Sequence, residues 1–178
     1  MSERQAPISF EFFPPNTPVG SEKLKTVVQD LSVLNPEFFS VTYGAGGTTR
    51  DRTLETVRRI VAETSLRPAA HLTCVGASKA EVNAVVQDFA AAGVRHIVAL
   101  RGDPPGGVGT RFTPHPEGYR NAADLVRGIK ELGDFEVSVS AYPKRHPESV
   151  SIEEDLAFMA DKAEHGATRA LSQFFFHN

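Results

Sequence analysis

The sequence has 178 residues, a formal net charge of −3 and 40% hydrophobic residues. This length fits a single domain that can bury a sizeable core. Lys and Arg are scattered rather than clustered, so no basic stripe indicates nucleic-acid binding. No apolar run approaches the roughly 18 residues that a membrane helix needs, and no hydrophobic region of a signal peptide follows the N-terminus. We therefore expect a cytoplasmic protein that binds neither nucleic acid nor membranes.

Short apolar runs alternate with stretches of helical periodicity along the whole chain. The apolar runs predict strands at residues 8–12, 38–42, 69–73, 96–100, 136–141 and 170–174. Between them, five helices are predicted with buried faces formed by Leu24, Val27, Leu31 and Leu34; Leu54, Val57 and Val61; Val82, Val85 and Phe89; Leu125, Ile129 and Leu132; and Ile152, Leu156, Met159 and Ala163.

Helix ends are marked by capping residues. Ser21 is the predicted N-cap of the first helix. Ser78 with Glu81, and Ser151 with Glu154, have the spacing of capping boxes. Glycines 93, 133 and 166 follow the third, fourth and fifth helices, where glycine commonly ends a helix.

The first strand delivers a carboxylate, Glu11, between two phenylalanines, and Pro14 and Pro15 then end the strand. A buried carboxylate is costly unless it is paired or protonated, although an edge-strand glutamate can also point to water. The later strands end in the same way, with polar residues at their exits: Tyr43, His71 with Thr73, Asp103, Tyr142 with His146, and Gln173. This repetition favours a functional role for Glu11.

Strict alternation of strands and helices predicts a parallel sheet with right-handed crossovers. Two architectures satisfy it, an open doubly wound sheet and a β/α barrel. The dinucleotide-binding fingerprint G-x-G-x-x-G is absent after the first strand. The segment Gly44-Ala45-Gly46-Gly47 follows the second strand and lacks that spacing. Polar residues at the ends of successive strands converge on one face of a barrel, so we favour the barrel.

Six motifs support a named resemblance: Ser9-Phe-Glu-Phe-Phe-Pro-Pro15, Ser40-Val-Thr-Tyr-Gly-Ala45, His71-Leu-Thr-Cys74, Leu100-Arg-Gly-Asp103, Ala141-Tyr-Pro143 with His146-Pro-Glu148, and Gln173-Phe-Phe-Phe176. In this order they resemble the methylenetetrahydrofolate reductase family. One departure is His177, where the family usually has an acidic residue.

The resemblance implies a (β/α)8 TIM barrel, of which about six strands and five helices lie in this chain as one domain, residues 1–178. A complete barrel takes about 250 residues, so the resemblance implies truncation after strand six. Enzymes of this family transfer a hydride from NADH or NADPH to FAD and then to 5,10-methylenetetrahydrofolate, yielding 5-methyltetrahydrofolate. The resemblance also implies a homo-oligomer at full length and a place in one-carbon metabolism and methionine biosynthesis.

The catalytic roles carry over by position. Glu11 matches the general acid that opens the folate's methylene bridge, and the flanking phenylalanines would raise its pKa by desolvation. Asp103 matches the aspartate near flavin and pterin. Gln173 matches the glutamine that contacts folate and nicotinamide, a role that suits an uncharged amide with donors and an acceptor.

The resemblance also implies a flavin site and no metal. The matched cofactor residues are Thr42, Tyr43, Ala45, His71, Leu100, Arg101, Gly102, Asp103, Ala122, Tyr142, His146, Asp155 and Lys162. Arg101 and Lys162 have the charge to face a pyrophosphate. Taken singly, Asp155 and Lys162 also suit solvated helix charges, and His71 suits an interior histidine. A non-catalytic flavin-binding module and a half-barrel that needs a partner chain remain alternatives to the enzyme.

Overall fold

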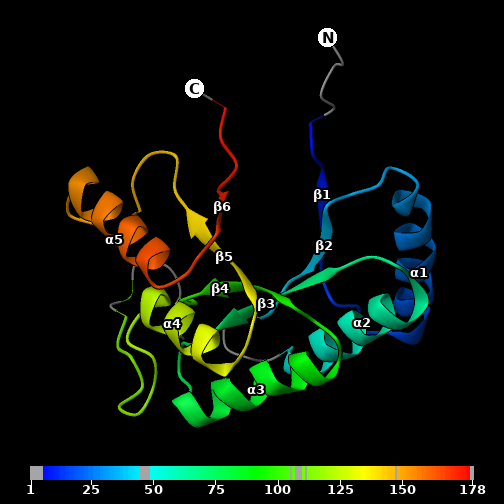
Figure 1. Ribbon diagram of the computed structural model, residues 1–178, viewed down its shortest axis with the longest axis horizontal. Helices are drawn as coiled ribbons and strands as arrows, with labels where there is room; N and C mark the ends of the chain where they lie inside the picture. Colours follow the sequence, from blue (N-terminus) through cyan, green and yellow to red (C-terminus); the bar gives the residue numbers. More distant parts are fainter. Residues whose placement is uncertain are drawn as a thin grey trace.

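The computed structural model describes residues 6–44, 49–104, 106, 110, 112–146 and 148–176. Six strands and five helices alternate in this part of the chain (Figure 1). The strands are β1 (Ser9–Phe12), β2 (Phe38–Val41), β3 (Pro68–Thr73), β4 (His96–Leu100), β5 (Glu136–Ala141) and β6 (Arg169–Ser172). The helices are α1 (Pro18–Ser32), α2 (Arg50–Glu63), α3 (Lys79–Ala91), α4 (Ala122–Leu132) and α5 (Ile152–Glu164).

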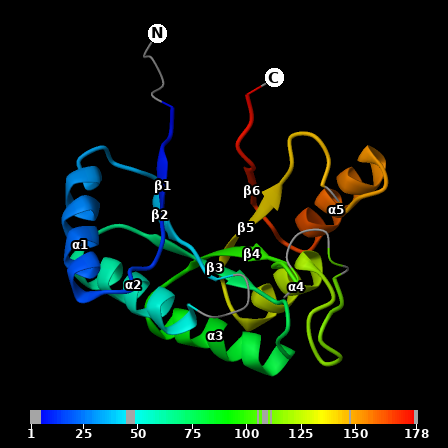
Figure 2. The ribbon, with the colours of Figure 1, turned by 180° about the vertical axis from the view of Figure 1, so that it is seen from behind.

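All strands join one parallel sheet in chain order, β1-β2-β3-β4-β5-β6. This order confirms the predicted contiguous sheet and excludes the doubly wound order. The sheet curls into a half-barrel with the helices on its outer side (Figures 1 and 2). None of the described helices is long and apolar enough to cross a membrane.

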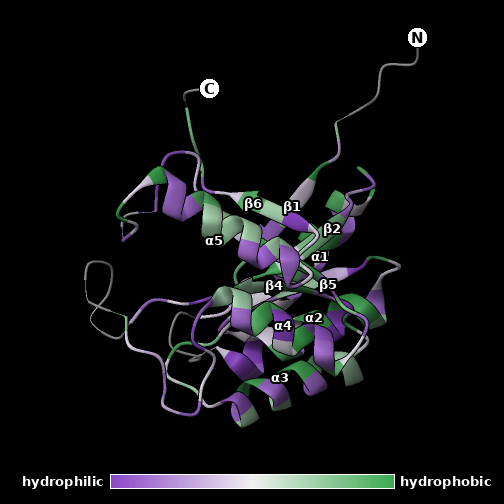
Figure 3. Ribbon diagram, turned by 60° about the vertical axis from the view of Figure 1, so that its left-hand side comes forward, coloured by the Kyte–Doolittle hydropathy of each residue, from purple (hydrophilic) through white to green (hydrophobic). Residues whose placement is uncertain are grey.

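The two faces of the sheet differ because side chains alternate along each strand. The outer face packs against the helices and forms the main core, which includes Phe39, Val41, Leu72, Ile97 and Val137. The inner face carries a small second cluster of Phe38, Ala69 and Val98, together with polar side chains. In Figure 3 hydrophobic and hydrophilic residues alternate around the helices, as expected for amphipathic helices over a sheet.

Arg169 on β6 reaches across the inner face to the beginning of β2. Its guanidinium pairs with Glu37 and, at 3.2 Å, with Glu136 at the start of β5. It also lies 5.0 Å from the centroid of the Phe38 ring, a cation–π distance. Residues 132 positions apart therefore meet at the amino-terminal end of the strands, and the curl of the sheet brings them together.

The structure corrects the predicted start of α1. The helix begins at Pro18, with Thr17 as N-cap, rather than after Ser21. Thr17 Oγ1 accepts a hydrogen bond from the Gly20 amide at 3.0 Å, and proline suits the first helical position because its missing N–H needs no partner there. Leu34, predicted on the buried face, lies beyond the end of the helix and is exposed.

The capping boxes differ in outcome. Ser78 and Glu81 form the predicted reciprocal pair of hydrogen bonds at the start of α3. Ser151 caps the Glu154 amide at 3.1 Å, but the Glu154 carboxylate accepts from the Val150 amide instead of the Ser151 amide. The second box is therefore only half formed.

The prediction of a buried face on α5 is wrong for the described structure. No residue of α5 is fully buried, and Ile152 and Leu156 are exposed. The strand prediction, 170–174, also extends too far, because β6 ends at Ser172 and the phenylalanines that follow are exposed, Phe174 by 86% and Phe176 by 83%. Both errors lie at the β6 edge of the sheet, where no further described strand or helix covers apolar side chains.

His96 is buried on the inner face, where its Nε2 lies 2.7 Å from Ser138 Oγ. Burial lowers its pKa below the ordinary value of about 6.5. The folded protein therefore binds a proton at this site less readily than the unfolded chain does. Stability from the neutral histidine is present above the ordinary pKa and is lost as the pH falls below it.

We predict that the urea midpoint of unfolding falls between about pH 7.5 and about pH 5.5, and that His96→Gln makes this fall smaller. Glutamine keeps a polar group for Ser138 but does not titrate. The comparison variant is His165→Gln, which removes a more exposed histidine at the C-cap of α5, and the fall should be smaller in His96→Gln than in this variant. Equal slopes in wild type and His96→Gln would contradict the prediction.

Candidate active site at the carboxyl ends of the strands

Glu11, Ser40 and His71 come together on the inner face from three neighbouring strands. Glu11 pairs with Ser40 in the β1–β2 register, and the Ser40 hydroxyl lies 3.4 Å from Glu11 Oε2. His71 Nε2 lies 3.2 Å from the same carboxylate oxygen. Despite this distance, the contact is not a hydrogen bond, and this buried nitrogen has no hydrogen-bond partner within the described residues.

The environment of Glu11 differs from the prediction. Phe10 and Phe12 point to the outer face and pack in the core, whereas the Glu11 side chain is 54% exposed on the inner face. The His71 imidazole is the largest influence on the pKa of Glu11, which lies below its usual range; partial burial acts in the opposite direction. The expected net rise in the pKa of Glu11 is therefore wrong. Strand alternation turns Phe10 and Phe12 away from the carboxyl group, so desolvation is outweighed by His71.

A larger cavity of about 560 Å³ lies at the ends of β4 and β5 and the beginnings of α4 and α5. Six of the predicted cofactor residues line it: Arg101, Ala122, Tyr142, His146, Asp155 and Lys162. They come from four segments (the β4 exit, the start of α4, the β5–α5 loop and α5), spread over 62 positions of sequence, and the parallel topology brings them to one place. A cavity of this size falls in the range of small-molecule sites.

The guanidinium of Arg101 is held in this cavity by a carboxylate and an aromatic ring. Its Nη1 and Nη2 donate to the two carboxylate oxygens of Glu148 at 2.5 and 3.0 Å, and its guanidinium lies 4.6 Å from the centroid of the Phe112 ring. Glu148 is the main cause of a raised Arg101 pKa, and Arg101 in turn lowers the pKa of Glu148. Glu148 belongs to the motif His146-Pro-Glu148, but the motif predicts no role for it.

Lys162 and Asp155 both hold the backbone of the cavity wall. Lys162 Nζ donates to the Ser140 carbonyl at 2.9 Å, and burial lowers the lysine pKa. Asp155 accepts from the His146 amide and from the Ser149 hydroxyl, each at 3.0 Å. Neither residue is merely a solvated helix charge.

The other predicted site residues are more scattered. Thr42, Tyr43 and Leu100 lie at the ends of β2 and β4 but do not line this cavity. Asp103 and Gln173 are exposed. The backbone N–H of Gln173 donates a hydrogen bond to the Ala141 carbonyl at 3.0 Å. Ala45 lies outside the described residues.

Gly102 follows Arg101 in a left-handed conformation, with φ +84°. A Cβ atom there would lie 2.6 Å from Val75 Cγ1 and 2.9 Å from Thr73 Cβ. The β4 exit therefore packs tightly against the β3 exit, and glycine is required by the protein itself.

We predict that Gly102→Ala lowers the free energy of unfolding by about 2–4 kcal/mol, the sum of left-handed strain and overpacking. Gly76→Ala is the matched control, because Gly76 also has a positive φ, +69°, but nothing within 4 Å of the added Cβ. It should cost only about 1 kcal/mol. Urea unfolding of both variants measures the difference, and equal losses would rule out the steric argument.

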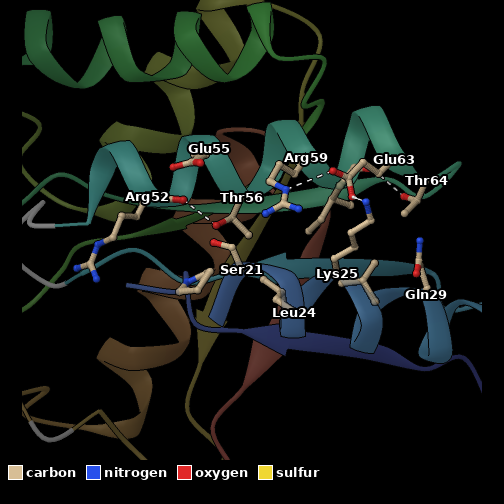
Figure 4. A pocket seen from close by; sticks show the side chains of 13 residues that line it. Ser21, Leu24, Lys25, Gln29, Arg52, Glu55, Thr56, Arg59, Glu63 and Thr64 are labelled. Atoms are coloured by element: carbon tan, nitrogen blue, oxygen red, sulfur yellow. Dashed lines mark hydrogen bonds and ion pairs between the residues drawn. The ribbon is translucent and has the colours of Figure 1, made fainter. Parts of the chain in front are cut away.

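A second cavity lies between α1 and α2 (Figure 4) and holds only about 30 Å³. Three of its charged lining residues pair with one another: Lys25 and Arg59 both contact Glu63, each at 3.3 Å. None of the predicted site residues lines it. It is a gap between packed helices with room for little more than a water molecule.

The fold and the site define a class of protein: a curled half-barrel of parallel β/α units with a ligand-sized cavity at the carboxyl ends of its strands. The family model described as methylenetetrahydrofolate reductase matches residues 1–178. The chain belongs to the methylenetetrahydrofolate reductase family.

Individual relatives agree with the family match. The chain is 48% identical over 169 residues to the 5,10-methylenetetrahydrofolate reductase of Pectobacterium carotovorum, covering 95% of this chain and 54% of that protein. It is 47% identical to the Salmonella typhimurium protein of that name, covering 97% and 56%. An Arabidopsis thaliana protein called methylenetetrahydrofolate reductase (NADH) 1 is 34% identical, with 97% and 31% covered. The chain spans about half the length of the bacterial relatives.

Solved structures support the fold alone. A 2,3-dimethylmalate lyase aligns with a TM-score of 0.62 at 9% identity, covering 94% of this chain and 58% of that one. A phosphoenolpyruvate phosphomutase from Streptomyces platensis aligns with a TM-score of 0.59 at 12% identity, covering 96% and 60%.

Proposed function

We propose that this chain forms the flavin- and folate-binding part of an enzyme that reduces 5,10-methylenetetrahydrofolate to 5-methyltetrahydrofolate with NADH or NADPH as hydride donor. Membership of the family supports the reaction. The observation that carries the proposal is the convergence of six matched cofactor residues on one cavity at the carboxyl ends of β4 and β5. Ligand sites of barrel enzymes lie at this end of the strands.

The donor set of the cavity fits FAD. Arg101 and Lys162 supply two cationic groups, and the first turn of α4, which includes Ala122 and Ala123, adds amides without intrahelical acceptors. These are the groups that bind a pyrophosphate. Tyr142, whose pKa is raised by burial, and His146 supply an aromatic surface, with ring centroids 4.6 Å apart.

FAD, when bound, would carry the hydride from the nicotinamide to the folate. The chain's own contribution is a proton, because reduction of the methylene bridge consumes one proton as the bridge opens at a folate nitrogen. Glu11 is the proposed donor, and His71 Nε2, 3.2 Å from its carboxylate, is the neighbouring polar group from β3.

Asp103 and Gln173 are the proposed folate contacts. Both follow strand ends and are exposed, so they are accessible to a ligand that lies over the inner face. Asp103 would stabilise positive charge on the folate as the bridge opens, and the Gln173 amide would bind folate and nicotinamide without adding charge.

We predict that Lys162→Ala weakens FAD binding about tenfold or more, because it removes a charged donor from the cavity. Quenching of flavin fluorescence during titration measures the dissociation constant. Lys130→Ala is the control: Lys130 also donates to a backbone carbonyl, that of Phe135 at 2.7 Å, but does not line the cavity. Unchanged affinity in Lys162→Ala would remove this residue from the cofactor site.

We predict that Glu11→Gln slows the folate half-reaction by about 10²- to 10⁴-fold, the usual contribution of general acid catalysis. Glutamine has the size of glutamate but does not deliver a proton. Flavin reduction by the nicotinamide involves no folate and should proceed at the wild-type rate. Stopped-flow absorbance of the two half-reactions, in protein of full family length, measures both rates.

The split between the half-reactions separates chemistry from structure. If Glu11 only stabilises the sheet, both rates should fall together with the unfolding midpoint. A wild-type folate step in Glu11→Gln would remove Glu11 from the mechanism. Binding of FAD without turnover at full family length would favour the alternative, a non-catalytic flavin-binding module.

A further inference from the structure

The cavity holds a carboxylate where its chemistry calls for an anionic ligand. Arg101, Lys162 and the first turn of α4 all line the cavity and all favour negative charge. Glu148 lines the same cavity and occupies both terminal nitrogens of the Arg101 guanidinium. This fork-to-carboxylate geometry is the one that a phosphate group also adopts with arginine.

We propose that Glu148 is an internal counter-ion for Arg101, which a diphosphate-bearing ligand displaces when it enters the cavity. The inference rests on the proposed function for the identity of the ligand, a flavin dinucleotide. It adds that binding is an exchange: one carboxylate leaves the guanidinium and one phosphate takes its place. Glu148 therefore reduces the affinity for the ligand while it keeps Arg101 paired in the ligand-free protein.

The pair is placed so that exchange is possible. Its side chains are 24% and 33% exposed, for Arg101 and Glu148 respectively, so water can solvate the carboxylate once it leaves. Exposed ion pairs contribute little to stability, typically less than about a fivefold change in an equilibrium constant. Phe112 stays against the Arg101 guanidinium at 4.6 Å and would hold the cation in position during the exchange.

The backbone around Glu148 does not need to move. Asp155 accepts hydrogen bonds from the His146 amide and from the Ser149 hydroxyl, which lie on either side of Glu148. The Val150 amide is bound by Glu154 at 2.7 Å. These contacts attach the segment to the first turn of α5, so a rotation of the Glu148 side chain alone releases Arg101.

The experiment compares FAD titrations of wild type, Glu148→Gln and the control Glu153→Gln, followed by flavin fluorescence. Glu153 lies on the first turn of α5, and its replacement changes the net charge equally, but it does not line the cavity. We expect Glu148→Gln to bind FAD tighter by up to about fivefold, and Glu153→Gln to bind as wild type does. In an Arg101→Ala background, Glu148→Gln should give no gain, because the competition no longer exists.

Equal or weaker binding by Glu148→Gln would overturn the inference, since Glu148 would then orient Arg101 rather than compete with the ligand. An equal gain in Glu153→Gln would overturn it too, because net charge would explain the effect. The same variants are titrated with inorganic pyrophosphate by calorimetry. If no variant binds FAD but pyrophosphate shows the expected order, the flavin assignment fails and the exchange stands. If neither probe binds to wild type or to Glu148→Gln, the exchange itself is wrong.

Discussion

The alternation of side chains along six parallel strands is the constraint on which the rest of this structure depends. One set of residues, including Phe39, Val41 and Leu72, is covered by helices and supplies most of the buried apolar surface. The other set, including Ser40, His71 and Ser138, faces the inside of the curl. Because the strands are parallel and in register, their polar inner residues and their exits all meet on one side. Core and site are thus two faces of one sheet.

The two ends of the inner face have different roles. At the amino-terminal end, Arg169 joins Glu37, Glu136 and Phe38, so charged groups there are already paired with each other. At the carboxyl end, Glu11 and His71 approach without completing a hydrogen bond, and Arg101 has only a partly exposed carboxylate as partner. Polar groups whose interactions are complete stabilise a fold, whereas incomplete or exchangeable ones are available to a ligand.

Much of this could be predicted from sequence. Strand–helix alternation fixed the parallel order, and the motif Leu100-Arg-Gly-Asp103 marked a strand exit where Gly102 is sterically required. Local patterns failed where the outcome depends on distant residues. The four apolar positions Ile152, Leu156, Met159 and Ala163 have helical spacing, but spacing does not reveal whether anything lies opposite them. The pKa of Glu11 failed for a similar reason: its sequence neighbours are apolar, while its spatial neighbour, His71, is 60 positions away.

Glu148 shows why a list of matched residues is an incomplete description of a site. Residues that contact a ligand leave a recognisable motif, but a group that occupies their place in the absence of ligand need not contact the ligand at all. Its role becomes visible only when the partner of Arg101 is known, because a carboxylate 47 positions away carries no signal of pairing in the sequence. A guanidinium left unpaired in a partly buried cavity would be costly, and a permanently buried ion pair would be unavailable to a ligand. A partly exposed carboxylate on a segment anchored by Asp155 lies between these extremes, so the same cavity is stable when empty and remains open to exchange.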